Sequence, residues 1–132
     1  MSAQPPNDIA RLDHIGADIV NACFSVHRAL GPGLLEGIYE QCVAAELEHK
    51  GIMVQRQVLF PVTYRGIRME TGYRVDLLVN ECVLVEIKAV AETLPVHRAQ
   101  LLTYLRLSGC RLGYLINFNN VMLRNGIRRL VL

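Results

Sequence analysis

The amino-acid sequence predicts a single α/β domain in which helices flank a mixed β-sheet. Apolar residues recur at helical steps of three and four over the first fifty residues, and from about residue 58 they alternate with more polar ones. A second helical pattern at 95–108 separates two short apolar runs that are typical of strands. With 132 residues, 52% of them hydrophobic, the chain has the size and apolar content of one compact domain.

We expect residues 8–132 to form this domain and residues 1–7, which contain Pro5 and Pro6, to be a disordered N-terminus. Asp8 is placed to cap a first helix, which the sequence Gly31-Pro32-Gly33 should end. The residues expected on its inward face are Ile9, Leu12, Ile15, Ile19, Cys23, Val26 and Leu30.

A second helix is predicted over residues 34–50, with Gly51 as its C-terminal cap. Its apolar spacing predicts one buried face, formed by Leu35, Ile38, Cys42, Ala45 and Leu47.

Strands predicted at 58–64 and 67–79 should form a hairpin around the turn residues Arg65-Gly66. This turn would place Tyr64 opposite Ile67, Val62 opposite Met69 and Phe60 opposite Thr71, with one face of both strands buried. Pro61 indicates that the first strand lies at an edge of the sheet, because proline has no amide hydrogen to donate.

A third strand is expected at 83–89, followed by a helix from Pro95 to about Ser108-Gly109 and a buried strand at 112–118. A short last strand at 127–132 would follow the turn-like sequence Arg124-Asn125-Gly126. The element order is therefore α-α-β-β-β-α-β with a further β-strand at the end.

The composition argues against several classes of protein. No apolar run approaches the roughly 18 residues that cross a bilayer, and the first seven residues lack the basic and apolar regions of a signal peptide. The 4 cysteines lie far apart and match no zinc-binding spacing. We therefore expect a cytoplasmic protein without membrane contact. A net charge of +2 is too small to indicate nucleic-acid binding by itself.

Charge is concentrated on one face of the hairpin formed by the second and third strands. The odd-numbered strand residues are all apolar, whereas Arg74, Asp76, Glu86 and Lys88 share the even-numbered face. A two-residue turn would put the two carboxylates on different faces. A three-residue loop, Asn80-Glu81-Cys82, keeps the apolar face continuous and sets Asp76 opposite Glu86, with Cβ atoms about 5 Å apart.

Two carboxylates at this separation repel each other unless a cation lies between them. A hard divalent cation takes oxygen ligands, bridges to phosphate and lowers the pKa of its bound water. Lys88, two residues after Glu86 on the same face, could orient or deprotonate a water or stabilise charge on the phosphate. The alternative is a surface ion pair, which is disfavoured because these charges interrupt a strongly apolar β-segment.

At these residues the chain resembles the PD-(D/E)XK nuclease superfamily, whose signature is an acidic residue on one strand and Glu-x-Lys on the next. Asp76 and Glu86-Ile87-Lys88 match it, although Val75 stands where the literal motif has proline. Residues 33–39 read Gly-x-x-Glu-x-x-Tyr, the motif of the GxxExxY family within that superfamily, and residues 100–104 read Gln-x-x-x-Tyr. Each motif is weak alone, but four in the expected order are strong.

The resemblance implies a restriction-endonuclease-like α-β-β-β-α-β core with an extra N-terminal helix. It implies that Asp76, Glu86 and the backbone carbonyl of Ile87 ligate Mg²⁺ (or Mn²⁺), with Glu36 completing the acidic cluster directly or through water. Lys88 would act on the nucleophilic water or on the phosphate.

The resemblance further implies that Gln100 and Tyr104, one helical turn apart, position the site or contact the nucleic-acid backbone. Tyr39 and Arg74 are candidates for the same role. Each also has a structural interpretation: Gln100 and Tyr104 as a helix-surface pair, Tyr39 as a ring packed under the sheet and Arg74 as a neutralising charge. Glu36 could likewise be a solvated helix residue.

The sequence thus favours a metal-dependent nuclease that hydrolyses phosphodiester bonds, with DNA as the expected partner and a homodimer as one way to cut both strands. The alternative is a catalytically silent nucleic-acid-binding or assembly module that keeps the fold. A small-molecule phosphohydrolase is disfavoured because the chain has no glycine-rich phosphate loop.

Overall fold

The computed structural model describes residues 8–132, so the expectation of a disordered segment at 1–7 lies outside the described part. The predicted order of helices and strands is confirmed. The elements are α1 (Ile9–Leu30), α2 (Glu36–His49), β1 (Val54–Tyr64), β2 (Ile67–Val79), β3 (Val83–Lys88), α3 (Pro95–Ser108), β4 (Leu112–Asn117), the 3-10 turn η1 (Leu123–Gly126) and β5 (Ile127–Val131). Within this range no helix has both the length and the apolarity to span a bilayer.

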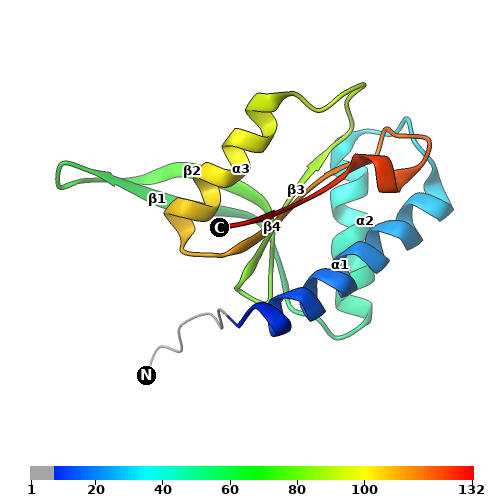
Figure 1. Ribbon diagram of the computed structural model, residues 1–132, viewed down its shortest axis with the longest axis horizontal. Helices are drawn as coiled ribbons and strands as arrows, with labels where there is room; N and C mark the ends of the chain where they lie inside the picture. The colour runs from blue at the N-terminus through cyan, green and yellow to red at the C-terminus, as the bar shows by residue number, and fades with distance from the viewer. Residues whose placement is uncertain (1–7) are drawn as a thin grey trace.

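The five strands form one mixed sheet in the order β1-β2-β3-β4-β5 (Figure 1). Strands β3 and β4 are parallel and are connected through α3, whereas the other neighbouring pairs are antiparallel. The edge position expected for the strand that contains Pro61 is confirmed, because β1 pairs only with β2.

Helices cover both faces of the sheet. Helices α1 and α2 lie together over one face, and α3 lies over the other, while the β1–β2 hairpin extends away from α1 and α2 (Figure 1). The larger core cluster joins α1 and α2 to residues such as Leu77, Val85 and Ile116, and the smaller one joins Leu101 and Leu105 of α3 to the opposite face.

Helix α1 begins and ends as its sequence predicts. The carboxylate of Asp8 accepts a hydrogen bond from the amide of Ala10 at 3.2 Å, and Gly31, with φ of 71°, donates its amide to the carbonyl of His27 at 2.8 Å. The expected inward residues between the ends are buried, but Ile9 and Leu30, the first and last residues of α1, are 37% and 40% exposed.

The inward face predicted for the second helix is largely wrong. Leu35, Ile38 and Ala45 are exposed and Cys42 is only half-buried, although Leu47 is buried as expected. The buried face is instead formed by Tyr39, Glu40, Val43, Ala44 and Leu47. The prediction left Glu40 out of the buried face because a carboxylate is costly to bury. Glu40 is nevertheless buried, because its carboxylate has hydrogen-bonding partners on β1.

The register of the first hairpin is partly confirmed. Tyr64 pairs with Ile67 and Val62 with Met69 around the Arg65-Gly66 turn, as predicted. Phe60, however, pairs with Tyr73 and not with Thr71, because the register shifts between Phe60 and Val62.

Gly72 lies at this irregularity. A Cβ atom there would come within 2.4 Å of Cγ2 of Val62 and within 2.8 Å of its backbone nitrogen, so the two strands approach closely at that point. Beyond the irregularity the hairpin leaves the core, and the burial predicted for its outer half is wrong: Tyr64, Ile67 and Met69 are 66%, 64% and 42% exposed.

The three-residue loop predicted between β2 and β3 is confirmed. Val79 pairs with Val83 and Leu77 with Val85 across it. Asn80 and Glu81 adopt φ of 49° and 58°, and the amide of Cys82 donates to the carbonyl of Val79 at 3.1 Å.

The continuous apolar face predicted for β2 is wrong at one point. Leu77 and Val79 pack with α1 and α2, whereas Val75 packs in the cluster that contains α3. The change of face occurs at Asp76, next to Gln57, a β1 residue with the left-handed φ of 53° that interrupts the ladder between the two strands. The candidate catalytic aspartate therefore lies at a local interruption of the sheet.

Candidate active site

The carboxylates of Asp76 and Glu86 lie where strands β2 and β3 separate. The regular ladder ends at Leu77 and Val85, and continuing that register by one step sets Asp76 opposite Glu86. The amide of Asp76 donates to Oε1 of Glu86 at 3.0 Å, and the amide of Ile87 donates to Oδ2 of Asp76 at 2.8 Å. Each carboxylate thus accepts an amide of the opposite strand, which satisfies groups that the open ladder leaves without a backbone partner.

Burial makes the ionised form of Glu86 costly. The residue is only 5% exposed, and its pKa is raised to about 7, first by burial and then by the charge of Asp76. The hydrogen bond from the amide of Asp76 and the charge of Lys88 act in the opposite direction.

The pKa of Asp76 is also raised, mainly by burial and further by the charges of Glu40 and Glu36. The amide of Ile87 partly offsets this rise. The pair therefore consists of two closely spaced carboxylates whose ionised forms are disfavoured by burial and by the neighbouring negative charges.

Lys88 occupies the last position of β3, pairs in register with Asn117 on β4 and is half-buried. Its carbonyl accepts the amide of Phe118 at 2.8 Å. Asn117 accepts the amide of Val90 and donates to the carbonyl of Val90, at 3.1 and 2.8 Å, which fixes the chain just after Lys88. Across residues 8–132 Lys88 takes part in no ion pair, so its ammonium group can meet an anionic substrate.

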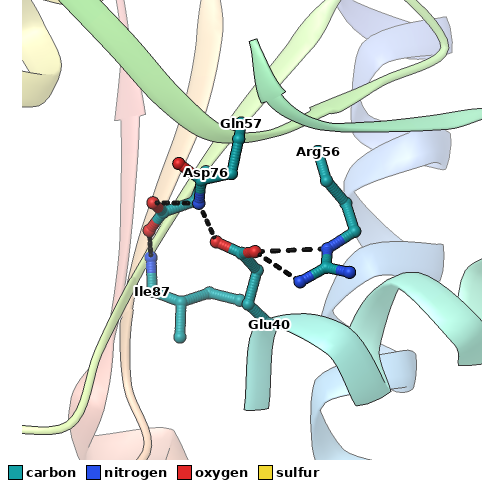
Figure 2. A network of polar contacts seen from close by, with 5 residues as sticks. All are labelled: Glu40, Arg56, Gln57, Asp76 and Ile87. Atoms are coloured by element: carbon teal, nitrogen blue, oxygen red, sulfur yellow. Dashed lines mark hydrogen bonds and ion pairs between the residues drawn. The ribbon is translucent and has the colours of Figure 1, made fainter. Parts of the chain in front are cut away.

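Sequence reasoning missed a polar chain that supports Asp76 from the first strand and second helix. Nε2 of Gln57 donates to Oδ1 of Asp76 at 3.3 Å and also to Glu40. Glu40, 5% exposed, accepts Nη2 and Nε of Arg56 at 2.9 and 3.2 Å. Figure 2 shows Gln57 between the two carboxylates, with Arg56 closing the chain on the far side of Glu40.

One signal in the sequence could have identified Glu40. It follows Glu36 by four residues, so the two carboxylates lie on the same side of α2. Gln57 had no such signal, because its role depends on a left-handed backbone conformation and on contacts with residues distant in sequence.

Glu36 is the first residue of α2 and is exposed. It is close enough for its charge to raise the pKa of both Asp76 and Glu86. The structure therefore brings the glutamate of the Gly-x-x-Glu-x-x-Tyr motif to the rim of the site.

Tyr104 on α3 lies close enough to the carboxylates for their charges to act on it. Its ring stacks on Tyr73 with centroids 4.5 Å apart, and its pKa is raised by burial and then by the charges of Glu86 and Asp76. Gln100 lies one turn earlier on the same helix and is exposed, and no contact in the described residues ties it to the carboxylates.

Tyr39 has a structural task in this arrangement. Its ring stacks on Phe118 at 4.6 Å, and its hydroxyl donates to the carbonyl of Gly31 at 2.6 Å and accepts the amide of Leu34 at 3.0 Å. Tyr39 thus holds the connection between α1 and α2. Arg74 is exposed on β2 two residues before Asp76 and forms no ion pair within the described range.

Within residues 8–132 no three histidine, cysteine, aspartate or glutamate side chains gather as a ready metal-binding group. Two carboxylates remain, the buried Glu86 and the half-buried Asp76, and they are linked through the backbone amides of Asp76 and Ile87. This donor set fits a hard divalent cation that completes its coordination with a backbone carbonyl and water.

Comparison with known proteins identifies the family. The model of the PD-(D/E)XK nuclease superfamily matches residues 13–130, which run from α1 into β5 and include the carboxylate pair and Lys88. No curated protein and no solved structure gives a significant match. The family match covers most of the chain, and the mixed sheet flanked by three helices is a restriction-endonuclease-like fold. The chain therefore belongs to the PD-(D/E)XK nuclease superfamily.

Proposed function

We propose that this protein is a divalent-metal-dependent nuclease of the GxxExxY branch that hydrolyses phosphodiester bonds in DNA. The observation that carries the proposal is the hydrogen-bonded pair of the half-buried Asp76 and the buried Glu86, with Lys88 at the end of the strand that holds Glu86. A silent module is less well supported, because all three signature residues are present and gathered at one point.

In this proposal Asp76, Glu86 and the carbonyl of Ile87 hold Mg²⁺ or Mn²⁺, and Glu36 contributes from the rim through water. A cation held there polarises the phosphoryl oxygen and supplies a reactive water at neutral pH. Before the cation binds, Glu86 must lose the proton that its raised pKa favours.

The protein's own groups have separate tasks. Lys88 places an ammonium beside the phosphate and stabilises the negative charge that grows on it. Gln57 and Glu40 hold the carboxylate of Asp76 in place, and Arg56 balances the buried charge of Glu40. Tyr104, and Gln100 further out, orient the nucleic-acid backbone from α3.

A cleavage panel tests this proposal. The purified protein is incubated with linear duplex, single-stranded and branched DNA, and with RNA, in Mg²⁺, Mn²⁺ or EDTA. We expect metal-dependent cleavage of at least one DNA form, and a loss of at least about 100-fold in Glu86→Ala and in Lys88→Ala. Glu48→Ala and Lys50→Ala, which remove exposed charges of the same sign at the far end of α2, should keep the activity.

Two results of the same panel would contradict the proposal. Cleavage that survives both Glu86→Ala and Lys88→Ala would show that another site or a contaminant acts. A protein that binds DNA equally well with Asp76→Ala and cleaves none of the forms would support the silent module.

We also propose a cytoplasmic location and a homodimer for cutting both strands of a duplex. The first is supported by four cysteines that are all free thiols, as a reducing compartment would keep them. Light scattering of the protein alone and with duplex DNA measures the second.

A further inference from the structure

Arg128 lies on the same sheet face as the carboxylate of Glu86. In the parallel pairing of β3 with β4, Glu86 stands opposite Leu115, and in the antiparallel pairing of β4 with β5, Leu115 stands opposite Arg128. Directly opposed residues project from the same face of a sheet, and Leu115 packs in the cluster that contains α3. Arg128 therefore lies two strand spacings from Glu86, or about 10 Å.

Next to this row is a cleft of about 300 Å³ between α3 and the sheet. Glu92 and Thr93 of the β3–α3 connection line it, together with Arg98 in the first turns of α3, Leu115 and Arg128. Leu115 thus lines the cleft and is also the neighbour of Glu86 on the adjacent strand.

The cleft presents more positive than negative charge. Both arginines are exposed, and in the part of the chain that the structure describes neither forms an ion pair. Nη1 of Arg128 donates to the carbonyls of Asn125 and Ile127 at 3.0 Å each, which fixes one edge of its guanidinium and leaves the other donors free. Glu92 is the one acidic residue that lines the cleft.

We propose that Arg98 and Arg128 form a phosphate subsite that binds the nucleic-acid backbone within about three nucleotides of the bond to be cut. The inference rests on the proposed nuclease function and adds a binding site to it. A guanidinium pair matches the paired oxygens of a phosphodiester, and Arg128 lies in the same row of the sheet as Glu86, two strands away. The subsite recognises the charge and spacing of the backbone phosphates, so its binding does not depend on the base sequence.

Binding measured without metal tests the subsite apart from catalysis. Fluorescence anisotropy of labelled 12-nucleotide single-stranded DNA and a 12-base-pair duplex is followed in EDTA over a salt series. We expect Arg98→Gln and Arg128→Gln to weaken binding several-fold and each to reduce the slope of log Kd against log salt by about 1. Arg128→Lys should retain the slope, and Glu92→Gln should tighten binding.

The matched control is Arg11→Gln, which removes an exposed arginine from α1 on the opposite face of the sheet. Cleft variants that change Kd and slope no more than Arg11→Gln does would overturn the subsite. Arg98 supplies a second test if Arg128→Gln does not fold, because Arg98 holds no neighbouring backbone. If the wild-type protein cleaves no nucleic acid in any condition but the cleft variants still bind DNA more weakly than it does, the nuclease function is refuted and the subsite is retained. Wild-type protein that binds neither DNA in EDTA would refute the subsite, whereas the nuclease is refuted by an absence of cleavage with Mg²⁺ and Mn²⁺.

Discussion

Glu86 is under two opposing constraints at the level of the single residue. It must be ionised to hold a cation, yet it is almost fully buried beside a second carboxylate. Its pKa, raised from 4.5 to about 7, expresses the cost of ionising it when no cation is present. The site thus stores electrostatic free energy that metal binding can release.

A pH dependence of stability follows from the raised pKa of Glu86. The folded protein binds this proton more tightly than the unfolded chain, so the stabilisation is complete below pH 4.5 and is lost as the pH rises through about 7. In EDTA we expect the free energy of unfolding to fall over this interval by on the order of 3 kcal/mol because of Glu86 alone. Urea denaturation between pH 4.5 and 8 measures it.

Glu86→Gln is the control for this prediction, because glutamine keeps the shape and cannot ionise. The variant should lose most of the fall and be more stable than the wild type at pH 8 in EDTA. An unchanged pH profile in Glu86→Gln would show that the fall has another source.

The site residues that could be predicted from the sequence depend on local signals, whereas those that were missed depend on contacts between residues far apart in the sequence. Asp76 and Glu86 could be paired because alternation and a short loop decide which residues face each other, and both are local properties. Glu40 and Gln57 could not be placed, because a buried carboxylate and a left-handed glutamine are stable only with partners from other elements.

The same distinction holds at the level of the element. The beginning of α1 at Asp8 and the end of α3 at Gly109 could be predicted from the sequence, because capping signals act within a few residues. The pairing of Phe60 with Tyr73 could not be derived, since it depends on the close approach of Gly72 to Val62 across the hairpin.

Helix α1 packs against β4 through another close approach. A Cβ atom on Gly16 would lie 2.1 Å from the hydroxyl oxygen of Tyr114, so Gly16→Ala must displace that ring or the helix. We expect a loss of about 1–3 kcal/mol in the free energy of unfolding, although alanine has the better helix propensity. Adding Tyr114→Phe removes the obstructing hydroxyl and should recover part of the loss, as measured by denaturation of both single variants and the double variant.

Gly37→Ala is the matched control for this packing prediction. It places a methyl group on α2 where nothing lies within 4 Å, so it should be neutral or stabilise by about 0.5–1 kcal/mol. Equal effects of the two substitutions would mean that backbone freedom, and not the contact with Tyr114, decides the cost.

At the level of the whole molecule, the site joins the sheet to a helix on each of its faces. Its carboxylates lie at the divergence of β2 and β3, its rim residue begins α2, and Tyr104 approaches from the opposite layer. A cation at this junction would tie both helical layers to the centre of the sheet. Metal binding should therefore be visible in the global stability of the domain.

We expect Mg²⁺ or Mn²⁺ to raise the melting temperature at pH 8, which is above the pKa of about 7 of Glu86, so that this carboxylate is mostly ionised. A cation at one hundred times its Kd stabilises the native state by about 2.7 kcal/mol, or roughly 10 °C for a domain of this size. The shift should vanish in Asp76→Asn and Glu86→Gln and persist in Glu48→Gln, which alters an exposed carboxylate outside the site. At pH 5 the shift should be smaller for the wild type, because the cation then competes with the proton on Glu86. A melting temperature that responds equally in all four proteins would place the cation elsewhere, and the carboxylate pair would then have no part in binding it.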